Sequence, residues 1–88
     1  MKRIDGKTLW ITGASSGIGE ALTYALDKKK CKLVISSRKE EELRRVKANC
    51  IYQENIKIVL LDLANLNDMP EKVQEAFSAF GQIDILIN

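Results

Sequence analysis

The sequence contains no histidine, one proline and two cysteines among its 88 residues. The lack of histidine excludes imidazole-based acid–base catalysis and most zinc sites from this stretch, so we expect no metal site. No apolar run approaches the ~18 residues that a membrane-spanning helix needs, so we expect no membrane segment. The start of the chain, "MKRIDGK", has no apolar segment typical of a secretory signal, and we therefore expect a cytoplasmic protein.

The charges of the chain are nearly balanced, with 14 Lys and Arg residues against 12 Asp and Glu residues. This small excess gives no electrostatic argument for nucleic-acid binding. The basic run Lys28–Lys30 instead suits the carboxyl end of a helix, where the helix dipole favours cations. Because no secretory signal is visible, we expect Cys31 and Cys50 to be reduced packing residues rather than a disulfide.

Four short runs rich in Ile, Leu and Val alternate with patterns of helical period. The runs are residues 8–12, 32–36, 56–63 and 83–88. The helical patterns comprise Ile18, Ala21, Leu22, Ala25 and Leu26, then Leu43, Val46 and Cys50, then Val73, Ala76, Phe77 and Phe80. Near-continuous apolar strands are typical of a parallel sheet that is covered on both faces. We therefore predict an α/β fold, the first half of a doubly wound (Rossmann) parallel sheet with strand order 3-2-1-4.

The predicted helices have recognisable ends. Ser37-x-x-Glu40 is a capping-box pattern for the second helix. Asp68, followed two residues later by the one proline, is typical of the start of the third, and Gly81 of its end. The first helix lacks a closing glycine, so we expect a left-handed Lys30 at a cost of about 1 kcal/mol, unless the turn takes another form.

Charged residues at helical spacing support the second helix. Glu40 and Arg44 lie four residues apart, and so do Glu41 and Arg45. Both pairs have the orientation that stabilises a helix, with the acid nearer the amino terminus.

A glycine-rich segment, "TGASSGIG" at residues 12–19, follows the first predicted strand and opens the first helix. Gly13 allows a sharp turn, Gly17 allows a pyrophosphate to approach the backbone, and Gly19 allows the helix to pack closely on the strand. The helix amino terminus then offers free N–H groups to phosphate. A purely structural tight turn is the alternative. A Walker loop is excluded, because no Lys-Ser/Thr pair follows the last glycine.

Three motifs, "TGASSGIG", "LDL" at residues 61–63 and "IDILIN" at residues 83–88, occur in the order and spacing of the short-chain dehydrogenase/reductase (SDR) family. The resemblance covers the chain from about residue 6. The segment "SSRKEEELRRVKANC" resembles more closely the subgroup around dehydrogenase/reductase SDR family member seven. The resemblance implies an NAD or NADP cofactor and a parent oxidoreductase that moves a hydride between nicotinamide and a carbonyl or alcohol carbon.

The resemblance also implies further cofactor-binding residues. Ser15, Ser16 and Ile18 join the three glycines around the phosphates and ribose. Asp62 and Leu63 are expected beside the adenine, although Asp62 could instead only cap a turn. Asn88 matches the family asparagine beside the adenosine ribose, which ties its strand to the glycine-rich segment. Thr12 is interpreted as a strand-stabilising hydroxyl rather than a ligand.

The end of the second strand indicates which dinucleotide is bound. NAD enzymes place an acid there to bind the ribose 2′-hydroxyl, whereas this chain has Ser37 and Arg38. A hydroxyl and a guanidinium suit a 2′-phosphate, so we expect NADP rather than NAD. The alternatives are that Ser37 only caps the helix and that Lys39 is only a solvated first-turn residue.

The resemblance places the catalytic Ser and Tyr-x-x-x-Lys of the family beyond residue 88. We therefore interpret residues 1–88 as the dinucleotide-binding portion of a Rossmann domain, truncated before the catalytic part, with no catalytic residue of its own. Tyr24 and Lys28 also spell Y-x-x-x-K, but they lie on the helix behind the phosphate loop and are not expected to react. A dinucleotide-sensing module and a purely structural fragment remain as alternatives. An uncovered fourth strand predicts self-association, and homo-oligomers are expected from the resemblance.

Overall fold

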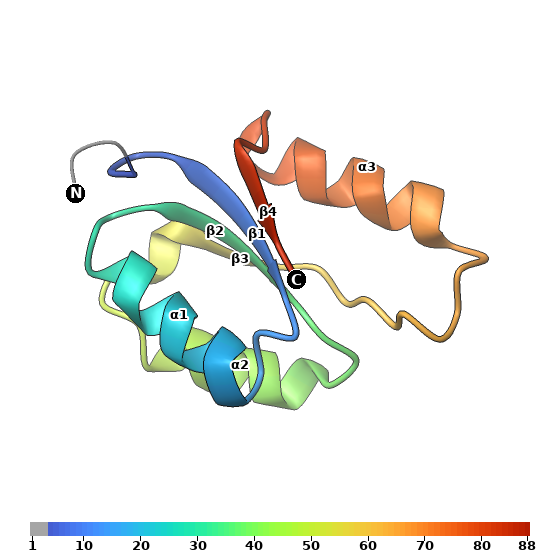
Figure 1. The fold of residues 1–88 in the computed structure, drawn as a ribbon, viewed down its shortest axis with the longest axis horizontal. Helices are drawn as coiled ribbons and strands as arrows, with labels where there is room; N and C mark the ends of the chain where they lie inside the picture. Colours follow the sequence, from blue (N-terminus) through green and yellow to red (C-terminus); the bar gives the residue numbers. More distant parts are fainter. Residues whose placement is uncertain (1–3) are drawn as a thin grey trace.

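The computed structural model describes residues 4–88 and confirms the α/β architecture (Figure 1). The elements, in chain order, are β1 (Thr8–Thr12), α1 (Gly17–Asp27), β2 (Lys32–Ser36), α2 (Glu40–Ala48), the short 3₁₀ helix η1 (Gln53–Asn55), β3 (Ile56–Ile58), α3 (Met69–Phe80) and β4 (Ile85–Ile87). The four strands form one parallel sheet in the order β3-β2-β1-β4, which is the predicted order.

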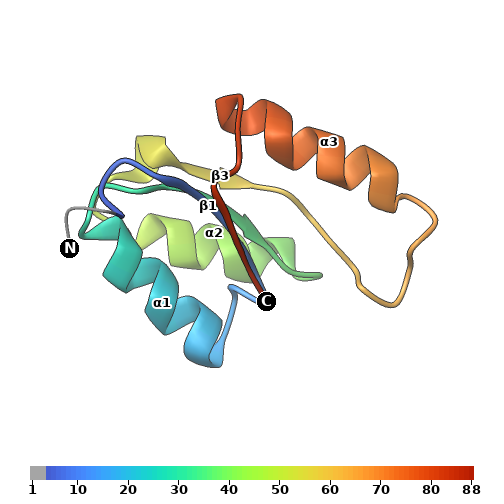
Figure 2. The same cartoon turned by 45° about the horizontal axis from the view of Figure 1, so that its top comes forward.

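Two layers of helix enclose this sheet. Helices α1 and α2 cover one face, and α3 lies on the other, as the turned view in Figure 2 makes clear. Successive side chains of a strand point to opposite faces. Thus Leu9 and Ile11 pack toward α1 and α2, whereas Trp10 packs toward α3. Burial of both faces explains why the strand sequences are apolar without a polar alternation.

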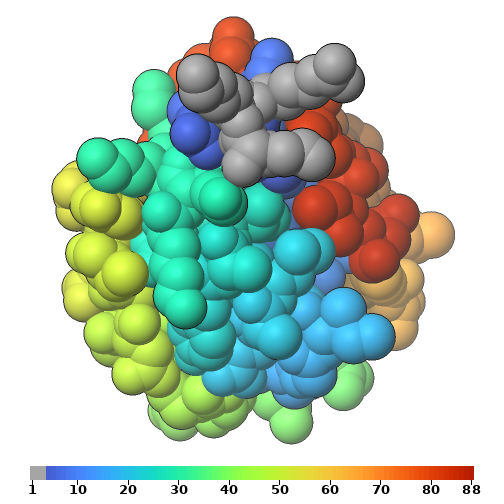
Figure 3. Space-filling model, turned by 60° about the vertical axis from the view of Figure 1, so that its left-hand side comes forward, coloured from blue at the N-terminus to red at the C-terminus, as the bar shows by residue number. Residues whose placement is uncertain are grey.

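The larger part of the core lies between the sheet and helices α1 and α2. Its fully buried side chains include Leu9, Ile11, Leu33, Ile35, Leu43, Val46 and Ile56. Figure 3 shows the outer surface of this layer, with α1 at its centre and the connection that follows α2 beside it. Cys31 and Cys50 are both buried here and unpaired, as the sequence predicts.

Asp27 joins the end of α1 to the connection that precedes β3. Its carboxylate is only 3% exposed and accepts hydrogen bonds from the backbone N–H groups of Ile51 at 2.6 Å and Tyr52 at 3.0 Å. A buried carboxylate needs such donors, because burying it without them would be costly. Lys30 adds to this corner by placing its ammonium 5.6 Å from the centre of the Tyr52 ring.

The smaller part of the core joins the sheet to α3. Trp10 is 5% exposed, and its indole N–H donates to the Ser36 hydroxyl at 2.8 Å. Ala76 is buried against it, and Phe80 is half-buried. Phe77, predicted on the same apolar stripe, is 46% exposed instead. Within the described residues, no element packs on the side of α3 where Phe77 lies.

Two predicted strands are shorter in the structure. Residues 56–63 were expected as one strand, yet β3 ends at Ile58. The chain nevertheless continues beside β2, since the N–H of Val59 donates to the Ile35 carbonyl and that of Leu61 to the Ser37 carbonyl. Residues 83–88 contribute only β4. Before it, the Asp84 carboxylate accepts the Thr8 N–H at 2.9 Å, which fixes where this edge strand begins.

The helix ends agree with the sequence in all but one case. Lys30 is left-handed with φ 60°, and Gly81 ends α3 with φ 84°. Asp68 occupies the cap position of α3, although its side chain makes no capping hydrogen bond. The predicted capping box at Ser37 is wrong. Lys39 is the cap residue of α2, and the Ser37 hydroxyl accepts the Lys39 N–H at 3.1 Å in a tight turn just before the helix.

Candidate nucleotide-binding site

The site is built around the turn from β1 into α1. Gly13 and Gly17 have φ values of 65° and 57°, which side chains rarely adopt. The N–H of Ala14 donates to the Ser36 carbonyl at 3.1 Å and so fixes the turn beside the end of β2. A Cβ placed on Gly19 would lie 2.1 Å from the Gly13 carbonyl oxygen. The glycine at position 19 therefore allows the helix to pack directly on the turn.

The amino terminus of α1 is open to a ligand. Its cap residue, Ser16, has an extended backbone and makes no side-chain capping hydrogen bond. The first N–H groups of a helix lack partners within the helix, and they carry the positive end of its dipole. At Gly13 and Gly17 no atom lies within 4 Å of the space where a Cβ would be. Both observations fit a phosphate group that approaches the backbone here.

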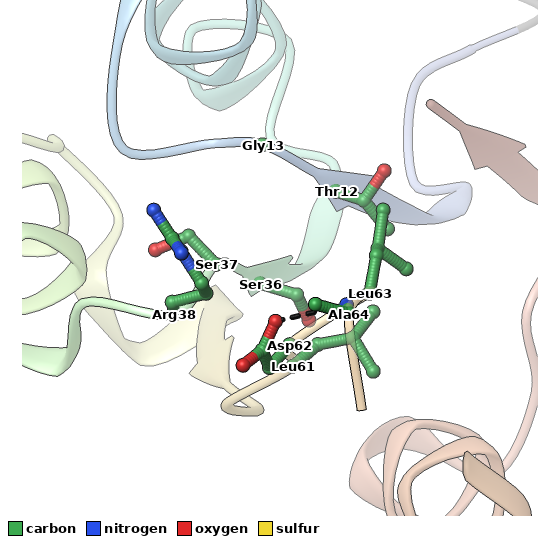
Figure 4. Close-up of a pocket in the computed structure, with 9 residues that line it drawn as sticks. All are labelled: Thr12, Gly13, Ser36, Ser37, Arg38, Leu61, Asp62, Leu63 and Ala64. Atoms are coloured by element: carbon green, nitrogen blue, oxygen red, sulfur yellow. Dashed lines mark hydrogen bonds between the residues drawn. The ribbon is translucent and has the colours of Figure 1, made fainter. Parts of the chain in front are cut away.

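A first pocket of about 330 Å³ lies beyond the carboxyl ends of β1 and β2 (Figure 4). Its lining residues are Thr12, Gly13, Ser36, Ser37, Arg38, Leu61, Asp62, Leu63 and Ala64. In this view Arg38 and Asp62 stand on one side, with Thr12 and Leu63 on the other. The structure thus brings predicted site residues that are far apart in the chain together at this edge. A flat ring could lie between the apolar Leu63 and the polar side.

A second pocket of about 320 Å³ adjoins the first. It is lined by Ser15, Ser16, Ser37, Arg38, Lys39 and Glu42. Ser37 and Arg38 line both pockets, so they stand where the two meet. Within residues 4–88 Arg38 has no ion-pair partner, and its exposed guanidinium is free to bind an anion. Hydroxyl groups and two cations around one hollow suit a phosphate.

Some of the predicted site residues line neither pocket. Gly17, Gly19 and Ile18 belong to the open end of α1. Ile18, also expected on the buried stripe of α1, is 87% exposed instead, since no described element covers its side chain. Asn88 accepts a hydrogen bond from the Thr12 hydroxyl at 2.9 Å. That contact joins β4 to the last residue before the glycine turn, in keeping with the predicted tie.

Asp62 shows the contact expected of a turn-capping aspartate. Its Oδ1 accepts the N–H of Ala64 at 2.9 Å, drawn as the dashed line in Figure 4. The carboxylate also lines the first pocket, where its other oxygen can accept from a ligand. The two interpretations of this residue are therefore compatible.

Sequence reasoning missed an ion-pair cluster beneath the glycine-rich turn. Arg45 of α2 donates to the Glu20 carboxylate at 2.9 and 3.1 Å and to the Ser15 carbonyl at 3.1 Å. It also pairs with Glu42 at 3.0 Å, so the predicted pairing with Glu41 is wrong. The other predicted pair, Glu40 with Arg44, is present. A contact across 25 to 30 residues leaves no periodic signal in the sequence.

Contacts within this cluster shift the pKa values of Glu20 and Arg45. The Arg45 guanidinium, helped by a hydrogen bond from the Tyr24 hydroxyl, lowers the pKa of the Glu20 carboxyl to about 2. In return, hydrogen bonds to Glu20 and Glu42 raise the pKa of Arg45 further above its ordinary value. Both groups therefore stay charged over the whole physiological range. The Tyr24 hydroxyl donates to Glu20 at 2.7 Å, and Tyr24 lines neither of the two pockets.

The residues that line the two pockets provide groups that can bind a ligand. Among residues 4–88 there is no cluster of three or more potential metal ligands, and no helix has the length and apolar character to span a membrane. The pockets offer hydroxyls, two cations, an open helix end and an apolar wall. This set of groups can hold an adenosine with attached phosphates.

Comparison with known proteins identifies the family. The family model described as short chain dehydrogenase matches residues 7–88. The chain belongs to the short-chain dehydrogenase family. Human "Dehydrogenase/reductase SDR family member 7" is 42% identical over 85 residues, which confirms the predicted likeness to that subgroup. This alignment covers 91% of the chain but 25% of the human protein, so the chain spans about a quarter of that relative's length.

Solved structures of the family have the same fold. A short chain dehydrogenase from Bacillus anthracis superposes with a TM-score of 0.86 at 32% identity, over 97% of this chain and 35% of that one. The 3-ketoacyl-(acyl-carrier-protein) reductase from Brucella melitensis, solved in complex with NADH, gives a TM-score of 0.84 at 34% identity, over 94% of this chain and 33% of that one. The Rossmann architecture expected from the sequence is thereby confirmed.

Proposed function

We propose that the chain is the NADP-binding portion of a short-chain dehydrogenase that transfers a hydride between nicotinamide and a carbonyl or alcohol substrate. The observation that carries this proposal is the meeting of the open glycine turn with Arg38 and Ser37 at one edge of the sheet. The NADH complex of the Brucella relative supports a nicotinamide dinucleotide in general. The choice of NADP depends on Arg38, which lines both pockets without an ion-pair partner in residues 4–88.

Each group in the site has a defined role in this proposal. The N–H groups at the start of α1 bind the pyrophosphate, and Leu63 packs on the adenine while Asp62 accepts from it. Asn88 borders the adenosine ribose, and Arg38 with Ser37 holds the 2′-phosphate. Bound NADP would supply or accept the hydride; the chain's own residues bind and orient its adenosine end. The acid–base residue of the proposed enzyme is expected after residue 88 in the sequence. A cytoplasmic location and self-association also stay predictions.

The test compares two fragments of the cofactor, 2′,5′-ADP and 5′-AMP, which differ only in the 2′-phosphate. Their dissociation constants are measured by calorimetry on the protein in the full length of its natural reading frame. We expect tighter binding of 2′,5′-ADP, and we expect Arg38→Met to remove about tenfold or more of that preference, since a charge-assisted hydrogen bond is lost. Arg44→Met is the control, because within the described part of the chain Arg44 pairs only with Glu40 on the same exposed helix face. Equal binding of the two fragments by the unaltered protein would refute the NADP assignment.

A further inference from the structure

Arg45 connects three elements around the nucleotide site. From its place on α2 it reaches Glu20 on α1, the Ser15 carbonyl in the glycine-rich turn, and Glu42 one turn earlier on its own helix. Among residues 4–88, its neighbour Arg44 has none of these long-range contacts and pairs with Glu40 alone. The two adjacent arginines therefore have the same chemistry but different surroundings.

Glu42 links the contacts of Arg45 to the proposed phosphate site, because it lines the second pocket. Among the described residues it is the one acid in the lining of the second pocket, which also includes the two cations Arg38 and Lys39. A carboxylate beside a phosphate site weakens phosphate binding, because like charges repel. In the structure the Oε1 of Glu42 accepts a hydrogen bond from Nε of Arg45 at 3.1 Å, and it lies 3.0 Å from Nη2 in the same ion pair. The negative charge of this pocket wall is thus already compensated.

Arg45 also contacts a second part of the same pocket lining. Ser15 and Ser16 line it, and the Ser15 carbonyl accepts from Nη2 of Arg45 at 3.1 Å. Glu20, whose side chain is 21% exposed, anchors the other side of the guanidinium. A planar guanidinium with five donors can serve all of these acceptors at once, which a lysine ammonium cannot do in the same geometry.

We propose that Arg45 is a positioning residue that sets the preference for the 2′-phosphate, by holding the Glu42 side chain along α2 and by tying the Ser15 carbonyl to α2. Without Arg45 the Glu42 carboxylate is free to turn toward Arg38 and neutralise it. Arg45 itself need not contact the ligand. The inference rests on the proposed function, because it concerns the same pocket and the same phosphate.

The experiment measures the ratio of the dissociation constants for 5′-AMP and 2′,5′-ADP in the natural-length protein. We expect Arg45→Met to lower this ratio by about two- to fivefold, the range of a partly exposed ion pair. Arg44→Met, the matched control, should leave it unchanged. Adding Glu42→Gln to Arg45→Met should return the ratio to its original value, since the freed carboxylate is then absent. A purely structural role for Arg45 would not be rescued in this way.

Arg45→Lys covers the case in which the methionine variant fails to fold. Lysine keeps the charge but cannot bond Glu42 and the Ser15 carbonyl together. We therefore expect the ratio of Arg45→Lys to lie below that of the unaltered protein and, where Arg45→Met also folds, above that of Arg45→Met. An unchanged ratio in the Arg45 variants, or no recovery in the double variant, would overturn the inference while leaving the NADP assignment intact. Lack of preference in the unaltered protein would instead overturn both.

Discussion

Replacing Gly19 by alanine should separate the glycine-rich turn from the helix that follows it. The added Cβ would lie 2.1 Å from the Gly13 oxygen, 2.8 Å from the Gly13 carbonyl carbon and 3.1 Å from the Ala14 Cα. All three are backbone atoms, so no flexible side chain can move aside. Relieving the contact requires the turn and α1 to part by about 1 Å.

The expected cost follows from two opposing effects. Overpacking a tight contact costs about 1–3 kcal/mol, and the upper end applies where only backbone can yield. Alanine recovers about 1 kcal/mol through its better helix propensity. We therefore expect Gly19→Ala to lower the free energy of unfolding by about 2 kcal/mol. The affinity for 5′-AMP should fall as well, because the displaced turn is the wall that the phosphate approaches.

Urea unfolding followed by circular dichroism measures the first quantity, and calorimetric titration with 5′-AMP the second. Gly81→Ala provides the matched control: Gly81 has φ 84°, no atom lies near its absent Cβ, and it is remote from the site. It should lose about 1 kcal/mol through the left-handed backbone but keep its nucleotide affinity. If Gly19→Ala matched the unaltered protein in stability and affinity, the close contact between the turn and α1 would not require glycine at position 19.

Two further predictions concern buried and paired carboxylates. Asp27→Asn should cost about 1–3 kcal/mol of stability, because one amide oxygen cannot replace both carboxylate oxygens at the N–H groups of Ile51 and Tyr52. The measurement is hydrogen exchange at those two amides, which should become faster in Asp27→Asn. The exposed control Glu54→Gln should leave their exchange rates unchanged. The pKa of Glu20 is lowered from 4.5 to about 2, so its contribution to stability is present above pH 4.5 and is lost as the pH falls toward 2. Glu20→Gln should flatten the pH dependence of urea midpoints in that window, and an unchanged slope would contradict the ion pair.

The architecture was predictable because its signals are local. Apolar runs identified four strands, helical periodicity identified three helices, and alternation of the two implied the parallel order that the structure shows. Lys30 could be predicted in a left-handed conformation since no glycine was available where the chain must turn. The glycine-rich segment was also informative, because its glycines stand at the positions where the backbone has positive φ or makes a close contact.

The errors concern residues with more than one possible partner. Ser37 fits a capping box by spacing, but its carbonyl accepts from Leu61 and so keeps the backbone beside the sheet for one more residue. The helix therefore begins later, at Glu40, and the serine hydroxyl is used in the preceding turn. Phe77 matches the apolar stripe of α3, but whether a stripe position is covered depends on neighbours that periodicity does not reveal.

Arg45 illustrates the limit of local reasoning most clearly. The sequence offered Glu41 four residues before it, an exposed helical pair worth about 0.3–0.5 kcal/mol. The fold instead brings Glu20, the Ser15 carbonyl and Glu42 within reach of one guanidinium, and several acceptors together outweigh a single solvated one. These acceptors come within reach of Arg45 only because α2 passes behind the glycine-rich turn in the folded chain. A motif in the sequence thus indicated candidate residues for binding a dinucleotide, whereas the contact of Arg45 with the Ser15 carbonyl became visible only when two helices were packed side by side.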